Sequence, residues 1–243
     1  MELKLEVTSV SLNYDRFSLS NINFSLKTHD MLGLFGRSGS GKSTIIKALL
    51  GQKELAHGSM SLYIDGRRVQ VNDYLGYSPQ QNSLFPLLSV EENLETFGQL
   101  SKMKDKEIRI RIDLLLRRLN LIHHRNKKII NLSGGMQKRV DLAVSLIHSP
   151  RLIILDEPFN GLDISLQSFI WELLTELSKE DKIIIIASHM LSDIQAHCNQ
   201  LGLVENGTYY NSEQIARSVS ASGEKSLEAF SERLFSYAYG KGN

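Results

Sequence analysis

Apolar and polar residues alternate over the first part of the chain. Between Leu3 and Lys27 the apolar positions form two runs, which are Leu5, Val7, Val10, Leu12 and then Leu19, Ile22, Phe24, Leu26. Such alternation is typical of strands that bury one face and expose the other. We therefore expect an N-terminal pair of half-buried antiparallel strands.

Further along, three short runs are apolar throughout, namely Met31–Phe35, Leu152–Leu155 and Ile183–Ala187. Each is followed by a turn and a helical pattern, as is typical of strands buried on both faces of a parallel sheet. The predicted fold class is α/β, with a mostly parallel sheet and an N-terminal antiparallel β subdomain.

Between Ser89 and Ser149 the apolar positions change to helical spacing, seen best at Ile108, Ile112, Leu115, Leu116 and Leu119. This spacing predicts a helical subdomain at 87–149, inserted between Pro86 and Pro150 into one domain that covers 1–217. For 218–243 we expect a small-residue linker, Ser218–Gly223, and then a short amphipathic helix patterned on Leu227, Phe230 and Leu234.

Composition narrows the function classes. The chain has 243 residues, 42% of them hydrophobic, which suffices for a real core. Its net charge of +1 gives no reason to expect nucleic acid as a partner. The basic stretch from Lys102 to Lys128 contains interspersed acids, so we interpret it as a solvated helix face. A lone cysteine, Cys198, and the lack of a leader predict a protein that is not secreted.

A glycine-rich segment follows the apolar run that ends at Phe35. It reads Gly36, Arg37, Ser38, Gly39, Ser40, Gly41, Lys42, Ser43, and Thr44 then opens a helical run to Leu50. In this context a Gly-x-x-x-x-Gly-Lys-Ser segment is a phosphate-binding loop: backbone N–H groups surround phosphate oxygens, Lys42 meets the β and γ phosphates, and the Ser43 hydroxyl ligates Mg²⁺. We predict a P-loop NTPase core, the alternative being an ordinary Gly/Ser turn.

Two acids end the apolar run at Leu155. Asp156 and Glu157 would lie at the carboxyl edge of the sheet, where the phosphate-binding loop also lies. Asp156 would hold Mg²⁺ through water, and Glu157 would act as the general base toward the water that attacks the γ-phosphate. The alternative is a solvated junction between strand and loop.

A third segment lies between these two. Asn131–Arg139 reads Asn-Leu-Ser-Gly-Gly-Met-Gln-Lys-Arg and opens a helical pattern, so Ser133, Gly134 and Gly135 form a second potential anion site or simply a helix cap. Here the chain resembles ABC ATPases, whose signature is usually Leu-Ser-Gly-Gly-Gln. Met136 replaces the glutamine, which puts in doubt any contact made by that side chain.

The resemblance assigns roles to four further residues, which occur in the family's order over roughly residues 3–211. It implies that Tyr14 stacks on adenine and that Gln80 reaches the metal and the attacking water. It also implies that Asp163, in Asn160–Asp163, senses the other subunit and that His189 contacts the γ-phosphate. Taken singly, these residues would be packing, loop, turn and structural positions.

The same resemblance implies ATP and Mg²⁺ as ligands and a head-to-tail dimer, in which each ATP is bound by the loop of one subunit and Ser133/Gly135 of the other. The second subunit would be an identical chain or a paralogue. A membrane permease would dock near Gln81–Leu94, where Leu84, Phe85, Leu87 and Leu88 gather, unless this cluster is ordinary packing. The expected location is the cytoplasmic face of the membrane, as a peripheral subunit.

The segment Ser133–Ala143 resembles ATPases of drug, lipid or polymer exporters, so export is the favoured direction and import the alternative. An ABC ATPase without a permease is a different function class, although the chain has neither the coiled-coil insertion nor the fused second domain that such relatives often carry. A P-loop kinase would leave the signature segment unexplained.

Overall fold

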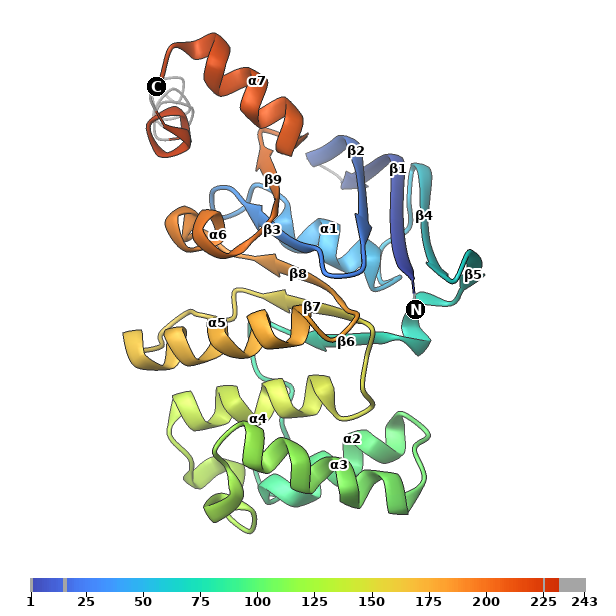
Figure 1. Cartoon of the computed structure of the whole chain (residues 1–243), viewed down its shortest axis with the longest axis vertical. Helices are drawn as coiled ribbons and strands as arrows, with labels where there is room; N and C mark the ends of the chain where they lie inside the picture. Colours follow the sequence, from blue (N-terminus) through green and yellow to red (C-terminus); the bar gives the residue numbers. More distant parts are fainter. Residues whose placement is uncertain (1, 15–16, 225, 232–243) are drawn as a thin grey trace.

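The computed structural model describes residues 2–14, 17–224 and 226–231, apart from the side chains of Tyr14 and Phe17. Its strands form one curled sheet in the order β5-β4-β1-β2-β10-β9-β3-β8-β7-β6 (Figure 1). The first part is antiparallel and consists of β1 (Leu3–Tyr14), β2 (Phe17–Lys27), β4 (His57–Ile64) and β5 (Arg67–Val69). The predicted antiparallel pair is confirmed, because Leu5 of β1 lies opposite Leu26 of β2.

The second part of the sheet is mostly parallel. It consists of β3 (Met31–Phe35), β6 (Leu75–Ser78), β7 (Leu152–Asp156), β8 (Ile183–Ala187), β9 (Gln200–Glu205) and β10 (Thr208–Asn211). Strand β3 pairs in parallel with β8 and β9, and β7 pairs in parallel with β6 and β8. The carboxyl ends of β3, β6, β7 and β8 therefore meet at one edge.

Both faces of these strands are buried, as the continuous apolar runs predicted. Along β3, Met31 and Phe35 belong to one hydrophobic core, and Leu32 and Leu34 belong to the other. Helix α1 (Lys42–Leu49) packs into the second core, together with the antiparallel strands. The first core lies beneath α5 (Ile164–Ser178), α6 (Leu191–His197) and the helical region that follows β6.

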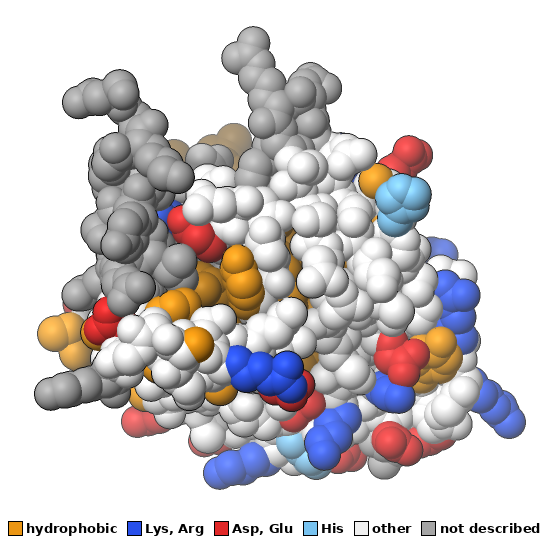
Figure 2. Space-filling view, turned by 90° about the horizontal axis from the view of Figure 1, so that it is seen from above, with side chains coloured by type: hydrophobic (Ala, Val, Ile, Leu, Met, Phe, Trp, Pro, Cys, Tyr) orange, Lys and Arg blue, Asp and Glu red, His pale blue; other side chains and the backbone are white. Residues whose placement is uncertain are grey.

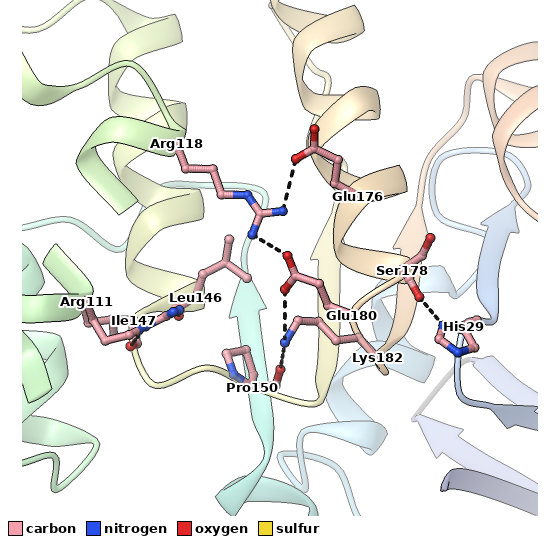
Figure 3. Close-up of polar contacts among 10 residues, drawn as sticks. All are labelled: His29, Arg111, Arg118, Leu146, Ile147, Pro150, Glu176, Ser178, Glu180 and Lys182. Carbon is pink, nitrogen blue, oxygen red and sulfur yellow. Dashed lines mark hydrogen bonds and ion pairs between the residues drawn. The ribbon is translucent and has the colours of Figure 1, made fainter. Parts of the chain in front are cut away.

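That helical region contains α2 (Val90–Leu100), α3 (Asp105–Arg118) and α4 (Gly134–Leu146), with 3-10 turns at Ile122–His124 and Ile129–Asn131. A further 3-10 turn, Val71–Asp73, precedes β6. The Arg118 guanidinium joins α3 to the end of α5 through Glu176 at 3.2 Å and Glu180 at 2.8 Å (Figure 3). None of the helices in the described residues is long and apolar enough to cross a bilayer.

The expected linker at 218–223 is wrong, because Ser218–Ser222 form the last part of α7 (Ser212–Ser222). Asn211 and Gln214 form a capping box at the start of α7, and Gly223, with φ 73°, ends the helix. Between these two caps the small serine and alanine residues are helical. Residues 227–231 are helical, with Leu227 buried, and Leu234 of the expected pattern lies outside the described residues. The division of the chain into domains at 217 stays a prediction.

The outer surface carries both signs of charge. On the face shown in Figure 2, lysine and arginine side chains are interspersed with aspartate and glutamate around the edge. That mixture agrees with the near-zero net charge of the sequence.

Candidate functional site

The predicted phosphate-binding loop joins the end of β3 to the start of α1, at the edge where the parallel strands end. Gly36 has φ 149°, and a Cβ atom placed there would lie 2.2 Å from the Val204 carbonyl oxygen. Gly41, with φ 114°, occupies the cap position of α1. The loop backbone thus takes a path that needs glycine, and its N–H groups meet the positive end of a helix dipole.

Lys42 is 6% exposed and lies inside this loop. Its ammonium donates to the carbonyl oxygens of Gly36 at 2.8 Å and Arg37 at 3.2 Å, and Oε1 of Glu157 lies 3.7 Å away. Burial lowers the pKa of Lys42, while the neighbouring acids oppose that shift. A cation held in this way is well placed for phosphate oxygens, which are stronger acceptors than carbonyls.

Ser43 and Asp156 come together from α1 and the end of β7. The Ser43 hydroxyl donates to Oδ1 of Asp156 at 3.3 Å. Burial raises the pKa of Asp156, the Ser43 hydrogen bond opposes this, and the charge of Glu157 adds to it. A hydroxyl and a carboxylate oxygen side by side are the hard ligands that Mg²⁺ prefers, so these two residues fit the metal that the sequence predicts.

Glu157 links two of the other predicted catalytic residues. Oε2 of Glu157 accepts from Nδ1 of His189 at 2.9 Å, while Oε1 faces Lys42. The Glu157 backbone has φ 49°, and its N–H donates to the Ala187 carbonyl at 2.8 Å, which fixes the turn after β7 against the end of β8. The structure therefore brings Lys42, Glu157 and His189 together at the edge of the sheet.

Two predicted residues are less completely placed. Gln80 follows β6, which pairs in parallel with β7, so its backbone lies at the same edge of the sheet as Asp156. Its side chain is exposed and forms no hydrogen bond within the described residues. The side chain of Tyr14 lies outside the described residues, and its stacking role stays a prediction. The other loop positions, Arg37, Ser38, Gly39, Ser40 and Thr44, occupy the turn and the start of α1 as the sequence indicates.

The signature segment caps α4. The hydroxyl of Ser133 accepts from the Met136 N–H at 3.3 Å, and no hydrogen bond of the described residues joins Ser133 to the phosphate-binding loop. Among the described residues, no atom lies within 4 Å of a Cβ placed at Gly134, whereas at Gly135 a Cβ atom would lie 2.7 Å from Leu166. Ser133 and Gly134 are exposed at the N-terminus of α4. Their backbone N–H groups are therefore accessible to an anion.

Asp163 caps the neighbouring helix. Its Oδ1 accepts from the Leu166 N–H at 2.9 Å, at the start of α5. Because Gly135 packs against Leu166, the first turns of α4 and α5 lie together. The side chain of Asp163 has a clear structural role here, and its assigned role in sensing another subunit stays a prediction.

A family model described as "ABC transporter" matches residues 19–160, which is more than half of the chain. The chain belongs to the ABC transporter family. An uncharacterised ABC transporter ATP-binding protein of Methanocaldococcus jannaschii is 34% identical over 208 residues, covering 85% of this chain and 76% of the relative.

A Nod factor export ATP-binding protein I of Rhizobium meliloti is 33% identical to this ABC protein over 207 residues. The match covers 84% of this chain but only 62% of that relative. A solved ATP binding subunit of an ABC transporter superposes with TM-score 0.82 at 27% identity, covering 95% of this chain and 99% of that one. CbiO1 of Clostridium perfringens, part of the ABC transporter complex cbiONQ, superposes with TM-score 0.74 at 28% identity. The match covers 89% of this chain and 94% of that one. This chain is an ATP-binding subunit of that family.

The predicted loop residue Ser40 has a buried hydroxyl with no hydrogen-bond partner among the described residues, as expected of a group that lines an anion site. One polar cluster of this ATP-binding subunit was not singled out from the sequence. Lys138, Asp141 and Ser78 form a buried cluster between α4 and β6. The spacing of Lys138 and Asp141, i and i+3 on a helix, does not by itself predict a buried cluster, since exposed ion pairs at this spacing are common.

Proposed function

We propose that this chain hydrolyses ATP as one half of a head-to-tail pair and drives a separate membrane permease. The observation that carries the proposal is the division of the site. Lys42, Ser43, Asp156, Glu157 and His189 converge on one edge of the sheet, whereas no hydrogen bond within the described residues joins them to the helix N-terminus that begins at Ser133. A second chain would supply that N-terminus across the nucleotide.

The chain's own residues account for the chemical step. Lys42 would transfer its hydrogen bonds from the loop carbonyls to the β and γ phosphates of ATP. Glu157 would accept the proton of the water that attacks the γ-phosphorus as the bond to the β-phosphate oxygen breaks, and His189 would orient Glu157 through its Nδ1 bond. Ser43 and Asp156, with Gln80, would hold Mg²⁺, which supplies charge neutralisation at the phosphates when bound.

A mixing experiment tests the shared site. Lys42→Ala removes the loop cation and Ser133→Ala removes the signature hydroxyl, so each variant alone should release little phosphate from ATP. In an equimolar mixture, half of the pairs are mixed, and each mixed pair contains one site with both groups intact. Turnover should rise well above the mean of the two separate variants. A mixture that only averages the two rates would contradict a head-to-tail pair of identical chains.

Permease docking is proposed at 81–94. Phe85 and Leu87 are 42% and 69% exposed. Ile130, 61% exposed, joins them because its N–H donates to the Pro86 carbonyl at 2.9 Å. Three large apolar side chains at one place on the surface favour contact with a partner, and a coupling helix of a permease is the partner that we propose. Through this contact the chain would be a peripheral subunit at the cytoplasmic face of the membrane.

Leu87→Ser tests this docking. The tagged variant should lose the integral membrane protein that co-purifies with the wild-type chain from solubilised membranes, while its ATP binding is retained. Leu100→Ser is the matched control, since Leu100 is 68% exposed but lies at the end of α2. Equal recovery of the membrane protein with both variants would exclude Leu87 from the contact.

Export is the direction that we infer. The Ser133–Ala143 segment and the Nod factor export relatives support it, although this chain covers less than two thirds of the length of those relatives. Import is the competing direction, which the sequence leaves open. Reconstitution of the co-purified complex in vesicles, with transport followed in both directions, separates the two.

A further inference from the structure

A buried ionic cluster ties the signature helix to the end of strand β6. It consists of Ser78, Lys138 and Asp141, which are 0%, 6% and 2% exposed. The Lys138 ammonium donates to Oγ of Ser78 at 2.9 Å, to Oδ2 of Asp141 at 3.2 Å and to the Pro79 carbonyl at 3.3 Å. The Ser78 hydroxyl in turn donates to Asp141. All three donors of the lysine are therefore used, and two of them reach the other element.

Stability alone does not account for this cluster. Removing two charges from water costs several kcal/mol per ion, and apolar residues of similar volume are often as stable in such positions. What the charges add is direction, because the Lys138 bonds to Ser78 and Pro79, and the Ser78 bond to Asp141, form only in one relative placement of α4 and β6. The cluster is thus suited to fixing the two elements in register.

A second contact fixes the same pair of elements. A Cβ atom at Gly76 would lie 2.2 Å from the Ser145 carbonyl oxygen, so the β6 backbone lies directly on α4 without an intervening side chain. Strand β6 and helix α4 are held at both ends of this contact, by Gly76 near Ser145 and by the ionic cluster near Lys138. Movement of the strand end must therefore be passed to the helix.

The two elements lead to the two half-sites. Pro79, whose carbonyl Lys138 holds, immediately precedes Gln80, and α4 begins at the Ser133 cap. We propose that Lys138 is a positioning residue, which makes the Gln80 segment and the signature segment of one chain move as a unit. Nucleotide at the chain's own loop would then set the placement of Ser133–Gly135, which serves the site of the second subunit. This inference rests on the proposed function.

The chain offers a matched control at the opposite edge of the sheet. Lys182 is also buried, at 7% exposed, and its ammonium donates to a proline carbonyl, that of Pro150, at 2.9 Å, with Glu180 at 4.0 Å (Figure 3). Pro150 precedes β7, far along the strand from Asp156 at its carboxyl end. Lys182→Met and Lys138→Met therefore make the same chemical change in similar surroundings, and only one of them touches the link.

The experiment compares both variants with the wild-type chain. Lys138→Met should bind ATP as a monomer within about twofold of the wild-type affinity but lower kcat by about 10-fold to 100-fold, because the two half-sites lose their register. In a Glu157→Gln background it should also weaken the ATP-dependent dimer. Lys182→Met should keep kcat and dimerisation, measured at a temperature where both variants are folded.

A second variant covers the case in which the uncompensated Asp141 unfolds the protein. Lys138→Met with Asp141→Leu removes both charges and should restore thermal stability without restoring kcat. If the double variant or Lys138→Met turns over like the wild type, or if Lys182→Met loses kcat equally, the positioning role is wrong. A wild-type chain without ATPase activity would instead overturn the proposed function itself.

Discussion

Glu157→Gln isolates the chemical step from nucleotide binding. Glutamine keeps the shape of the side chain and can still accept from Nδ1 of His189, which lies 2.9 Å from Oε2. What it loses is the negative charge and the ability to take a proton from water. Because the phosphate-binding loop and the Ser43–Asp156 pair are untouched, the substitution should leave the nucleotide site assembled.

The expected magnitude follows from the contacts. Loss of a general base lowers a rate by about 10²-fold to 10⁴-fold, or about 3 to 5 kcal/mol in the barrier. The effect on folding should be much smaller. Lys42 loses a carboxylate 3.7 Å away but keeps two carbonyl bonds, and the charge of Glu157, which helps to raise the pKa of Asp156, is removed. These effects oppose each other, so stability should change by about 1 kcal/mol or less.

The assay has three readouts: phosphate release, ATP affinity, and molecular mass by light scattering with Mg²⁺ and ATP. The variant should bind ATP at least as tightly as the wild-type chain, turn over slowly and accumulate as an ATP-bound dimer. Glu176→Gln is the control. That glutamate is exposed and lies outside the nucleotide site, where its carboxylate pairs with the Arg118 guanidinium at 3.2 Å (Figure 3). Unchanged turnover in Glu157→Gln would refute its role as base, and lost ATP binding would make it a binding residue.

Three further predictions follow from individual contacts. Lys42→Ala should lose most ATP affinity in an equilibrium titration, and tight binding would count against the loop assignment. Asp156→Asn should stabilise the nucleotide-free chain at neutral pH. Burial raises the pKa of Asp156 in the folded state, so the ionised carboxylate lowers the free energy of unfolding at neutral pH. The gain in stability, measured by urea denaturation, should vanish toward about pH 4, where the acid is protonated in both states. Gly76→Ala should cost about 1 to 3 kcal/mol by overpacking against Ser145, whereas Gly134→Ala, with open space around it, should unfold like the wild type.

Part of the site was predictable because its chemistry is local. The Gly36–Ser43 loop carries its own backbone requirements, and the apolar runs before it and before Asp156 place both at strand ends. The Asn-Gly dipeptide at 206–207 is a further local signal, which apolar periodicity does not contain. Asn206 and Gly207, with φ 47° and 75°, join β9 to β10 in a tight hairpin of the kind that Asn-Gly favours. That dipeptide, between two short apolar runs, is typical of a hairpin and so predicts both strands.

Other features depend on contacts between distant parts of the chain. Ile130 belongs to the exposed apolar surface near Leu87 only because a backbone bond brings it to Pro86. Gly76 must be glycine only because Ser145 lies against it, and residues 218–222 of the expected linker at 218–223 are helical because α7 is capped at both ends. No periodicity within one segment contains this information, since each constraint needs a partner from another element.

The sequence by itself determined the chemical groups and the strand ends that carry them, because glycine, lysine and acidic residues at fixed spacing leave few other uses for those positions. It also predicted the division of the nucleotide site between the loop and the signature segment, through the family resemblance. Only the tertiary structure decided that Lys138 and Asp141 meet Ser78, more than fifty residues earlier in the chain. The physical reason is burial: a charged side chain in a helix pattern has many possible partners, and the packing of α4 on β6 leaves Lys138 only Ser78, Pro79 and Asp141 among the described residues.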